Sequence, residues 1–307
     1  MDKPGRTCPV TYRYGARALA GPPTLTADTL WIAGGLYGNV PALERLESLV
    51  GDDHAGARLV FNGDFHWFDV ADEAFAAVEA GVARHLATRG NVETELAAPN
   101  AGAGCGCAYP EWVDEGDVAR SNRILDRLRE TAGRVPGAAR RLAALPMHLV
   151  AEVGGIRIGI VHGDADSLAG WGFSQEALST SGGMSAASRW FGIAGVKVFA
   201  SSHTCLPVLR SIDGGIVVNN GAAGMPNFRG TGYGLATRIS VRPYADALYG
   251  ARTGGVHVDT VAIPFDAKAW QAAFLEQWPE GSDAHASYWS RILGGPRYTV
   301  DAALQAA

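Results

Sequence analysis

The chain has 307 residues, 47% of them hydrophobic and 19% charged, which is enough for one large α/β domain or two small ones. Its net charge of −5 argues against a broad basic surface, so no nucleic acid is expected as a partner. No apolar run approaches the ~20 residues that span a bilayer, and none resembles a signal peptide. The 4 cysteines are too few for a disulfide framework, so we expect a cytoplasmic protein with reduced thiols and no membrane partner.

The first ninety residues alternate short apolar runs with helical periodicity. Residues 29–33 and 58–61 are apolar runs that end in glycine-containing loops, which is typical of strands in α/β proteins. Residues 41–50 carry leucines at helical spacing, and residues 70–89 show the apolar face of one long helix. The pattern predicts strand, helix, strand and helix before Gly90.

The middle of the chain changes character twice. Residues 97–146 carry two stretches of helical periodicity, which predict a helical insertion. Strand patterns then return, with glycine-containing turns that predict hairpins. The predicted segments are a hairpin at 148–161, a strand at 196–200 and a second hairpin at 206–219. Because no repeat or long linker divides the chain, we expect a single domain over 1–307 with a C-terminal extension from about 243 to 307.

The C-terminal part predicts two strands, at 237–241 and 257–263, and then a helix with an aromatic stripe. The stripe consists of Trp270, Phe274 and Trp278, which recur every four residues. Aromatic residues at this spacing are typical of a helix face packed in a core, so we do not assign them to a ligand.

Polar side chains follow the predicted elements at four loops. Asp64 and His203 follow predicted strands, His162 follows the first hairpin, and Asn91 follows the predicted long helix. Loops at strand ends are where α/β folds place metal ligands, because the sheet fixes the backbone while the side chain stays free. A carboxylate, an amide oxygen and two imidazoles suit Mn, Fe or Zn better than Ca or Mg.

The order of these loops resembles the calcineurin-like metallophosphoesterase family. That family shows the blocks Asp-x-His-Gly-Asn, Gly-Asp, Gly-Asn-His-Asp/Glu, a mid-chain His, Gly-His-x-His and Asn-Pro-Gly-Ser. The corresponding blocks here are Gly35-Leu36-Tyr37-Gly38-Asn39, Gly63-Asp64, Gly90-Asn91-Val92-Glu93, His162-Gly163, Ser202-His203-Thr204-Cys205 and Asn219-Asn220-Gly221-Ala222. The resemblance implies an α/β fold of two packed mixed β-sheets flanked by helices, an αββα sandwich with the metal centre at the strand ends.

The resemblance also implies one intact metal site and one that is largely erased. In the family a bridging Asp, here Asp64, is completed for one metal by residues that correspond to Asn91, His162 and His203. The second metal would need ligands where this chain has Gly35, Tyr37 and Cys205. Glycine offers no ligand, the tyrosine phenol keeps its proton at neutral pH, and cysteine binds only as a thiolate. We therefore expect one metal ion and doubt the second, and we keep Tyr37 and Cys205 as candidates for contacts with a second ion or with the substrate.

The family's proton donor, the His of Gly-Asn-His, is Val92 in this chain. Valine transfers no proton, and the loss of a general acid costs on the order of 10²–10⁴ in rate. His66 is the nearest substitute in sequence, although a histidine in this aromatic loop fits a purely structural role equally well. Asn39 begins the first helix and is expected to present its N-terminus to an anionic substrate.

Cys105 and Cys107 stand in a glycine-rich loop shortly after Asn91, where they could fold over the metal crevice. Two cysteines at this spacing do not make a closed zinc site, which needs four ligands. A redox pair, a substrate contact and ordinary loop thiols all remain compatible with the pattern.

Three functions follow from these residues. The first is a hydrolase of small phosphate esters, which would turn over aryl phosphates faster than alkyl phosphates for want of a proton donor. The second is a non-hydrolytic descendant of the fold that binds a metal or an anion. The third is a different metal-dependent reaction in which cysteine takes part. The substrate and the oligomeric state do not follow from the sequence.

Overall fold

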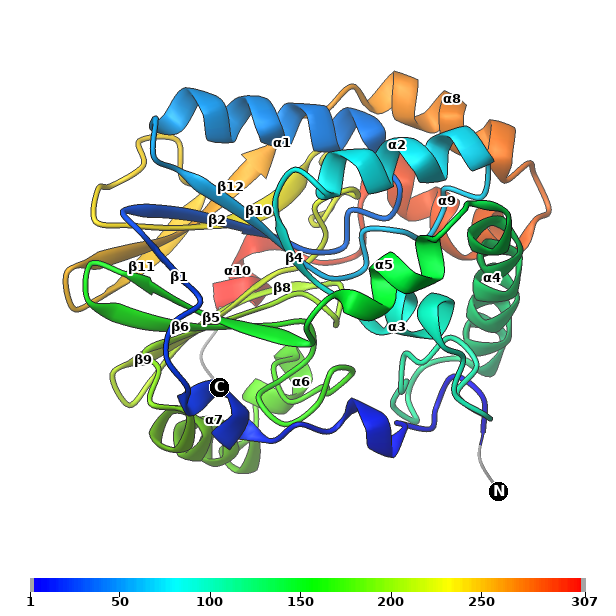
Figure 1. Cartoon of the computed structure of the whole chain (residues 1–307). Helices are drawn as coiled ribbons and strands as arrows, with labels where there is room; N and C mark the ends of the chain where they lie inside the picture. The colour runs from blue at the N-terminus through cyan, green and yellow to red at the C-terminus, as the bar shows by residue number, and fades with distance from the viewer. Residues whose placement is uncertain (1–2, 305–307) are drawn as a thin grey trace.

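The computed structural model describes residues 3–304 and has two six-stranded mixed sheets packed face to face (Figure 1). The first sheet has the order β1 (Leu25–Ala27), β5 (His148–Val153), β6 (Ile156–Val161), β7 (Val198–Ser201), β9 (Gly215–Asn220) and β8 (Pro207–Ile212). The second has the order β11 (Tyr249–Thr253), β12 (Val256–Ile263), β10 (Gly234–Ser240), β2 (Thr29–Ala33), β3 (Arg58–Asn62) and β4 (Leu86–Thr88). The predicted sandwich of two mixed sheets is confirmed.

Helices cover the outer face of each sheet (Figure 1). The outer face of the second sheet packs against α1 (Val40–Asp53), α2 (Asp72–Val82) and α8 (Ala267–Gln277). The outer face of the first sheet packs against α7 (Ser181–Ala194), which follows the short α6 (Gln175–Leu178). The remaining helices are η1 (Val10–Tyr12), η2 (Ala16–Ala20), α3 (Asn91–Ala97), α4 (Glu115–Arg134), α5 (Ala138–Ala144), α9 (Asp283–Gly294) and α10 (Val300–Leu304). No helix between residues 3 and 304 is long and apolar enough to cross a membrane.

Strand alternation explains why residues 30–33 of β2 are all apolar. Leu30 and Ile32 face the other sheet and join the cluster between the sheets, whereas Trp31 and Ala33 face the helical layer. Successive side chains of a strand point to opposite faces, so the middle of a strand that is buried on both faces is apolar at successive positions. The parallel pairs β2–β3–β4 and β6–β7–β9 bring their carboxyl ends to one edge of the sandwich, where the candidate ligands lie.

The predicted long helix at residues 70–89 is wrong in its second half. Helix α2 ends at Val82, and Leu86–Thr88 form strand β4, parallel to β3. A short apolar run is compatible with a helix and with a strand. Here residues 86–88 form a strand because they pair with Val60, Phe61 and Asn62 at the edge of the sheet. Asn91 therefore follows a strand, as the other candidate ligands do.

Helices α8 and α9 pack near the loop after β3 and against α4. Trp270, Phe274 and Trp278 are buried among the aromatic side chains behind the loop after β3, which confirms that the stripe belongs to the core. Helix α9 then packs on α4, where Arg123 pairs with Asp283. This packing places α4, from the predicted insertion, and α9 side by side at the edge of the sandwich.

Candidate metal centre

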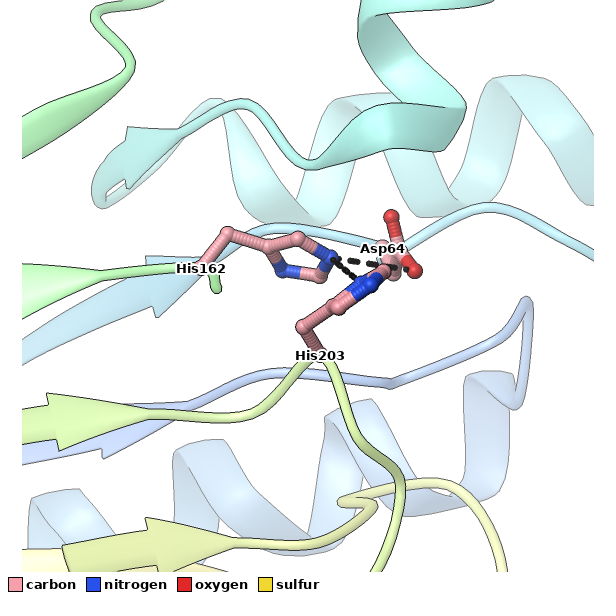
Figure 2. A group of neighbouring side chains, drawn as sticks. All are labelled: Asp64, His162 and His203. Carbon is pink, nitrogen blue, oxygen red and sulfur yellow. Dashed lines mark hydrogen bonds and ion pairs between the residues drawn. The ribbon is translucent and has the colours of Figure 1, made fainter. Parts of the chain in front are cut away.

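Three side chains from three strand ends meet at the carboxyl edge of the sheets (Figure 2). Asp64 follows β3, His162 follows β6 and His203 follows β7, and one ligand atom from each lies within 4.8 Å of the others. The His162 Nε2 atom is 3.3 Å from Asp64 Oδ2 and 3.1 Å from His203 Nδ1. All three side chains are buried, and they are the one such group of His, Cys, Asp or Glu found in residues 3–304.

Asn91, the first residue of α3, adds an amide oxygen to the group. Its Oδ1 atom lies 3.1 Å from His162 Nε2, and its Nδ2 donates to the Cys105 carbonyl at 3.0 Å. Because the amide nitrogen is engaged by that carbonyl, the oxygen is turned toward the histidines. Cys105 therefore touches the centre through its backbone, which orients Asn91.

The backbone around Asp64 is strained and tightly packed. Asp64 itself has φ of +51°, a left-handed conformation that costs free energy in a non-glycine residue. A Cβ added at Gly90 would lie 2.2 Å from Asp64 Oδ1, and one at Gly63 would lie 2.6 Å from the Gly90 nitrogen. The two glycines let the loops after β3 and β4 approach closely enough to share one centre.

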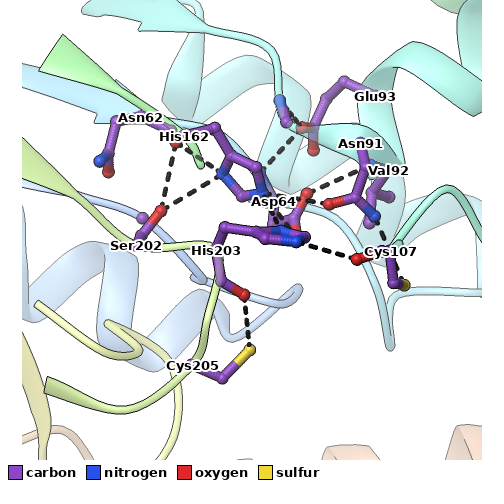
Figure 3. A network of polar contacts seen from close by, with 12 residues as sticks. Asn62, Asp64, Asn91, Val92, Glu93, Cys107, His162, Ser202, His203 and Cys205 are labelled. Carbon is purple, nitrogen blue, oxygen red and sulfur yellow. Dashed lines mark hydrogen bonds and ion pairs between the residues drawn. The ribbon is translucent and has the colours of Figure 1, made fainter. Parts of the chain in front are cut away.

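Glu93 holds these two loops together (Figure 3). Its buried carboxylate accepts hydrogen bonds from the backbone N–H groups of Asp64, Phe65, His66 and Gly90 at 2.8 to 3.3 Å. The sequence motif contained Glu93 but gave it no role. Its position at the start of α3, as the acidic half of a capping box, is the signal that could have found it.

Each histidine uses its second nitrogen to fix the ring (Figure 3). His162 Nδ1 lies 2.9 Å from the carbonyl oxygen of Asn62, and His203 Nε2 lies 3.0 Å from that of Cys107. Ligating histidines in metal sites are oriented in this way by outer partners. The tautomer that donates to each carbonyl leaves a lone pair on the nitrogen that faces the centre.

The electrostatics of the group suit a cation. Burial and the neighbouring charge of His162 lower the pKa of His203 to about 3, so this imidazole is neutral at neutral pH. Burial alone would raise the pKa of Asp64, but the charge and contact of His162 outweigh it and lower that pKa. In turn Asp64 raises the pKa of His162 against the effect of burial. The carboxylate is therefore ionised and needs a positive partner.

These donors fit a metal ion. A carboxylate, an amide oxygen and two imidazole nitrogens converge without a hydrophobic side chain between them, and outer partners already orient three of the four. An ion of the Mn, Fe or Zn type binds such mixed oxygen and nitrogen sets. The Asp64, His162 and His203 cluster can therefore hold a metal ion.

The residues at the place of the family's second site contact one another instead of converging on a centre. Tyr37 Oη lies 2.8 Å from Cys205 Sγ. A Cβ added at Gly35 would lie 2.9 Å from the Tyr37 ring, so the phenol fills the space beside Gly35. Burial raises the pKa of Tyr37 and of Cys205, so both groups keep their protons at neutral pH.

His66 and Asn39 are both buried in the interior of the protein. His66 is fully buried, with Nδ1 at 2.5 Å from Asp69 and its ring stacked on Phe75 at 3.9 Å. Burial would lower the pKa of His66, but Asp69 outweighs it and raises that pKa to about 9. Asn39 is also fully buried, where it caps α1 by accepting from Ala42 and donates to the Gly224 carbonyl. Neither residue lines the cavity described next.

A cavity of about 270 Å³ opens over the centre, with Asp64, Asn91 and His203 in its wall. Aromatic side chains make up much of the remaining wall, and sequence reasoning gave none of them this role except Tyr37. They are Tyr37, Trp67, Tyr109, Trp171 and Tyr288. Cys107 and Cys205 also line the cavity, whereas Cys105 is fully buried beneath it. Tyr109 comes from the predicted insertion and Tyr288 from α9, so segments far apart in sequence enclose one site.

Comparisons with known proteins place the fold. No protein-family model matches the sequence, and no curated protein sequence matches it. A hypothetical protein from Pyrococcus horikoshii superposes with a TM-score of 0.58 at 19% identity, covering 89% of this chain and 100% of that one. A metallophosphoesterase from Sphaerobacter thermophilus superposes with a TM-score of 0.55 at 15% identity, covering 87% of this chain and 100% of that one.

Together the two-sheet sandwich and the Asp64, His162 and His203 cluster at its strand ends define an α/β fold with a candidate metal site. More particularly, the chain has the fold of the metallophosphoesterase from Sphaerobacter thermophilus, which is the fold that its motifs predicted.

Proposed function

We propose that the chain is a metal-dependent hydrolase of phosphate esters that uses one ion of the Mn, Fe or Zn type. The observation that carries the proposal is the convergence of Asp64, His162 and His203 beside a cavity, with Asn91 turned toward them. An ion held by these four residues would polarise a phosphoryl oxygen and lower the pKa of a bound water. The contact between Tyr37 and Cys205 supports a single ion, because these groups occupy the second site themselves.

The cavity supports a small substrate with an aromatic leaving group. Val92 lies in the cavity wall, at the place of the family's proton donor, and offers no proton. A leaving group that departs without protonation must be acidic, as phenols are and alkyl alcohols are not. The aromatic wall of Tyr109, Trp171 and Tyr288 can pack against such a ring.

A second candidate is a metal-dependent binding protein without turnover. The observation that favours it is the combined replacement of the second-site ligands and of the proton donor, since Tyr37 contacts Cys205 and Val92 is inert. Such a protein would keep the ion and the cavity and would hold an anionic ligand.

Elemental analysis of protein purified without chelator, together with an aryl phosphate assay, tests the proposal. One ion per chain and turnover that Asp64→Ala abolishes would support the hydrolase. One ion without turnover of any ester would favour the binding protein. Asp72→Ala serves as a matched control, because Asp72 is exposed and pairs only with Arg134 on the surface. Activity that survives complete loss of metal would contradict both candidates.

A further inference from the structure

We propose that Arg291 forms an anion subsite beside the erased second metal position and binds a phosphoryl oxygen of the substrate. The inference rests on the proposed function, because it names how the same cavity would hold the phosphate. Arg291 belongs to α9, outside the motifs that resemble the family, and nothing in the sequence pattern pointed to it.

The surrounding backbone fixes the position of the guanidinium. Arg291 Nη2 donates to the Cys205 carbonyl at 2.8 Å, and Nε donates to the Pro226 carbonyl at 3.0 Å. Cys205 is the residue whose thiol contacts Tyr37 at the erased site, and Arg291 lines the same cavity as Asp64 and His203. The cation therefore stands on the side of the cavity where a second metal ion would supply positive charge.

The charge of Arg291 has no carboxylate partner among residues 3–304. No ion pair of Arg291 occurs in that part of the chain. Of the two carboxylates on this wall, Asp64 contacts His162 at 3.3 Å and Asp117 pairs with Arg120 at 2.5 Å. The Nη1 group of Arg291 has no acceptor in the described residues, and it is not among their buried unpaired polar atoms. The two N–H groups of Nη1 are therefore free to bind a ligand, on a side chain that lines the cavity.

Charge balance explains why the site would need this cation. A divalent ion with ionised Asp64 carries about one net positive charge, whereas a phosphate monoester at neutral pH carries up to about two negative charges. Two metal ions would make up the difference in a dinuclear site. A guanidinium can do so here, because its N–H groups match the spacing of phosphate oxygens and it stays protonated.

Calorimetric titration with inorganic phosphate tests the subsite without reference to turnover. We expect Arg291→Met to weaken phosphate binding about 10- to 100-fold, both with metal and in metal-free protein, as for the loss of a charge-assisted hydrogen bond. Arg291→Lys, which keeps the charge but not the fork, should fall between the wild type and Arg291→Met. Arg123→Met is the matched control: it removes one positive charge from an exposed side chain that pairs with Asp283 and does not line the cavity, and it should leave phosphate affinity unchanged.

Circular dichroism separates a binding defect from misfolding. If Arg291→Met does not fold, Arg291→Lys carries the test, because it preserves a donor to the two carbonyls. A folded Arg291 variant that binds phosphate within twofold of the wild type would overturn the inference, and so would a wild type that binds no phosphate.

The two proposals can fail separately. If no ester is hydrolysed but phosphate binding depends on Arg291, the hydrolase is wrong and the subsite stands. If esters are hydrolysed and Arg291→Met leaves both KM and phosphate affinity unchanged, the subsite is wrong and the hydrolase stands.

Discussion

His203 and Cys205 are two residues apart, yet the structure gives them different chemistry. The His203 ring turns Nδ1 toward His162 and is neutral at neutral pH, whereas the Cys205 thiol contacts Tyr37 and keeps its proton. Metal binding should therefore depend on His203 and not on Cys205.

Replacing His203 by alanine should remove one of four donors and reduce metal affinity more than the 10- to 100-fold cost of losing an outer partner. Cys205→Ser should retain the ion, because its side chain is not a ligand in this arrangement. Metal content after dialysis, measured by mass spectrometry, checks both variants. Loss of metal from Cys205→Ser at the level of His203→Ala would show that the thiol coordinates.

Glu93 is the residue on which the shape of the centre depends most. Glu93→Ala would leave four buried N–H groups without their acceptor, and we expect it to lower the free energy of unfolding by about 3 kcal/mol. It should also weaken metal binding, since the loop that carries Asp64 loses its anchor. Denaturant unfolding and metal titration measure the two effects.

Glu73→Ala is the control for Glu93, because it removes an exposed glutamate from the first turn of α2. It should change neither stability nor metal affinity appreciably. A Glu93→Ala protein as stable as the Glu73→Ala protein would show that water replaces the carboxylate without cost.

At the scale of elements, helix α1 ends on a carboxylate that its own dipole disfavours. Asp53 is the last residue of α1, where the negative end of the helix dipole repels an anion. Arg238 on β10 offsets this cost with bonds of 2.7 and 3.1 Å, and Trp31 on β2 donates at 2.9 Å. Through Arg238 and Trp31, Asp53 therefore joins α1 to the neighbouring strands β10 and β2.

Asp53→Asn should lower the free energy of unfolding by about 3 kcal/mol near pH 7, as for breaking a buried ion pair. Burial alone would raise the pKa of Asp53, but the bonds to Arg238 and Trp31 lower it. Because the pKa of Asp53 is lower in the folded state, its ionised carboxylate stabilises the protein at pH values above the ordinary aspartate pKa of ~3.9. This stabilisation is lost as the pH falls below that value. The difference between wild type and variant should therefore shrink from pH 7 to pH 3.

Denaturant midpoints across that pH range measure this difference. Asp72→Asn, which affects an exposed pair with Arg134, should show little effect at any pH. A destabilisation by Asp53→Asn that stays constant between pH 7 and pH 3 would contradict an electrostatic origin.

The elements that the sequence predicted correctly are those whose local pattern and tertiary role agree. Residues 29–33 form β2 with the predicted bounds, and the Gly154-Gly155 turn joins β5 to β6 as expected. Strand β4 and helix α7 were missed for opposite reasons. A three-residue strand gains its identity from the neighbouring β3, and α7 contains Gly182, Gly183 and Gly192, which disfavour a helix until its apolar face is buried.

For the candidate site, the ligands were predictable, and of the cavity wall only Tyr37, Cys107 and Cys205 were named from the sequence. Asp64, Asn91, His162 and His203 stand in short motifs at strand ends, so local sequence marks them. The cavity wall combines residues from the predicted insertion with α9 near the end of the chain. Contacts between segments so far apart in sequence depend on how the helices pack together, and no local sequence pattern predicts that packing. His66 and Asn39 remain predictions as catalytic residues, and their buried positions favour packing and capping.

At the scale of the whole molecule, the sandwich supplies the candidate metal ligands, while α9 and the predicted insertion supply much of the cavity wall. Two properties of a substrate, its aromatic ring and the acidity of its leaving group, can therefore be tested separately. The aromatic wall should act on binding, because it contacts the ring. The absence of a proton donor at Val92 should act on turnover, because it concerns the departing oxygen.

Phenyl phosphate and benzyl phosphate separate these effects, since both carry a ring but only the first has an acidic leaving group. We expect similar KM values, because the same wall of Tyr109, Trp171 and Tyr288 receives either ring. The kcat for benzyl phosphate should be lower by about 10²–10⁴, which is the contribution of a general acid that this site lacks. Steady-state release of inorganic phosphate measures both constants with one assay. Equal kcat values would mean that another group protonates the leaving oxygen, because an alkoxide cannot depart as readily as a phenolate without a proton.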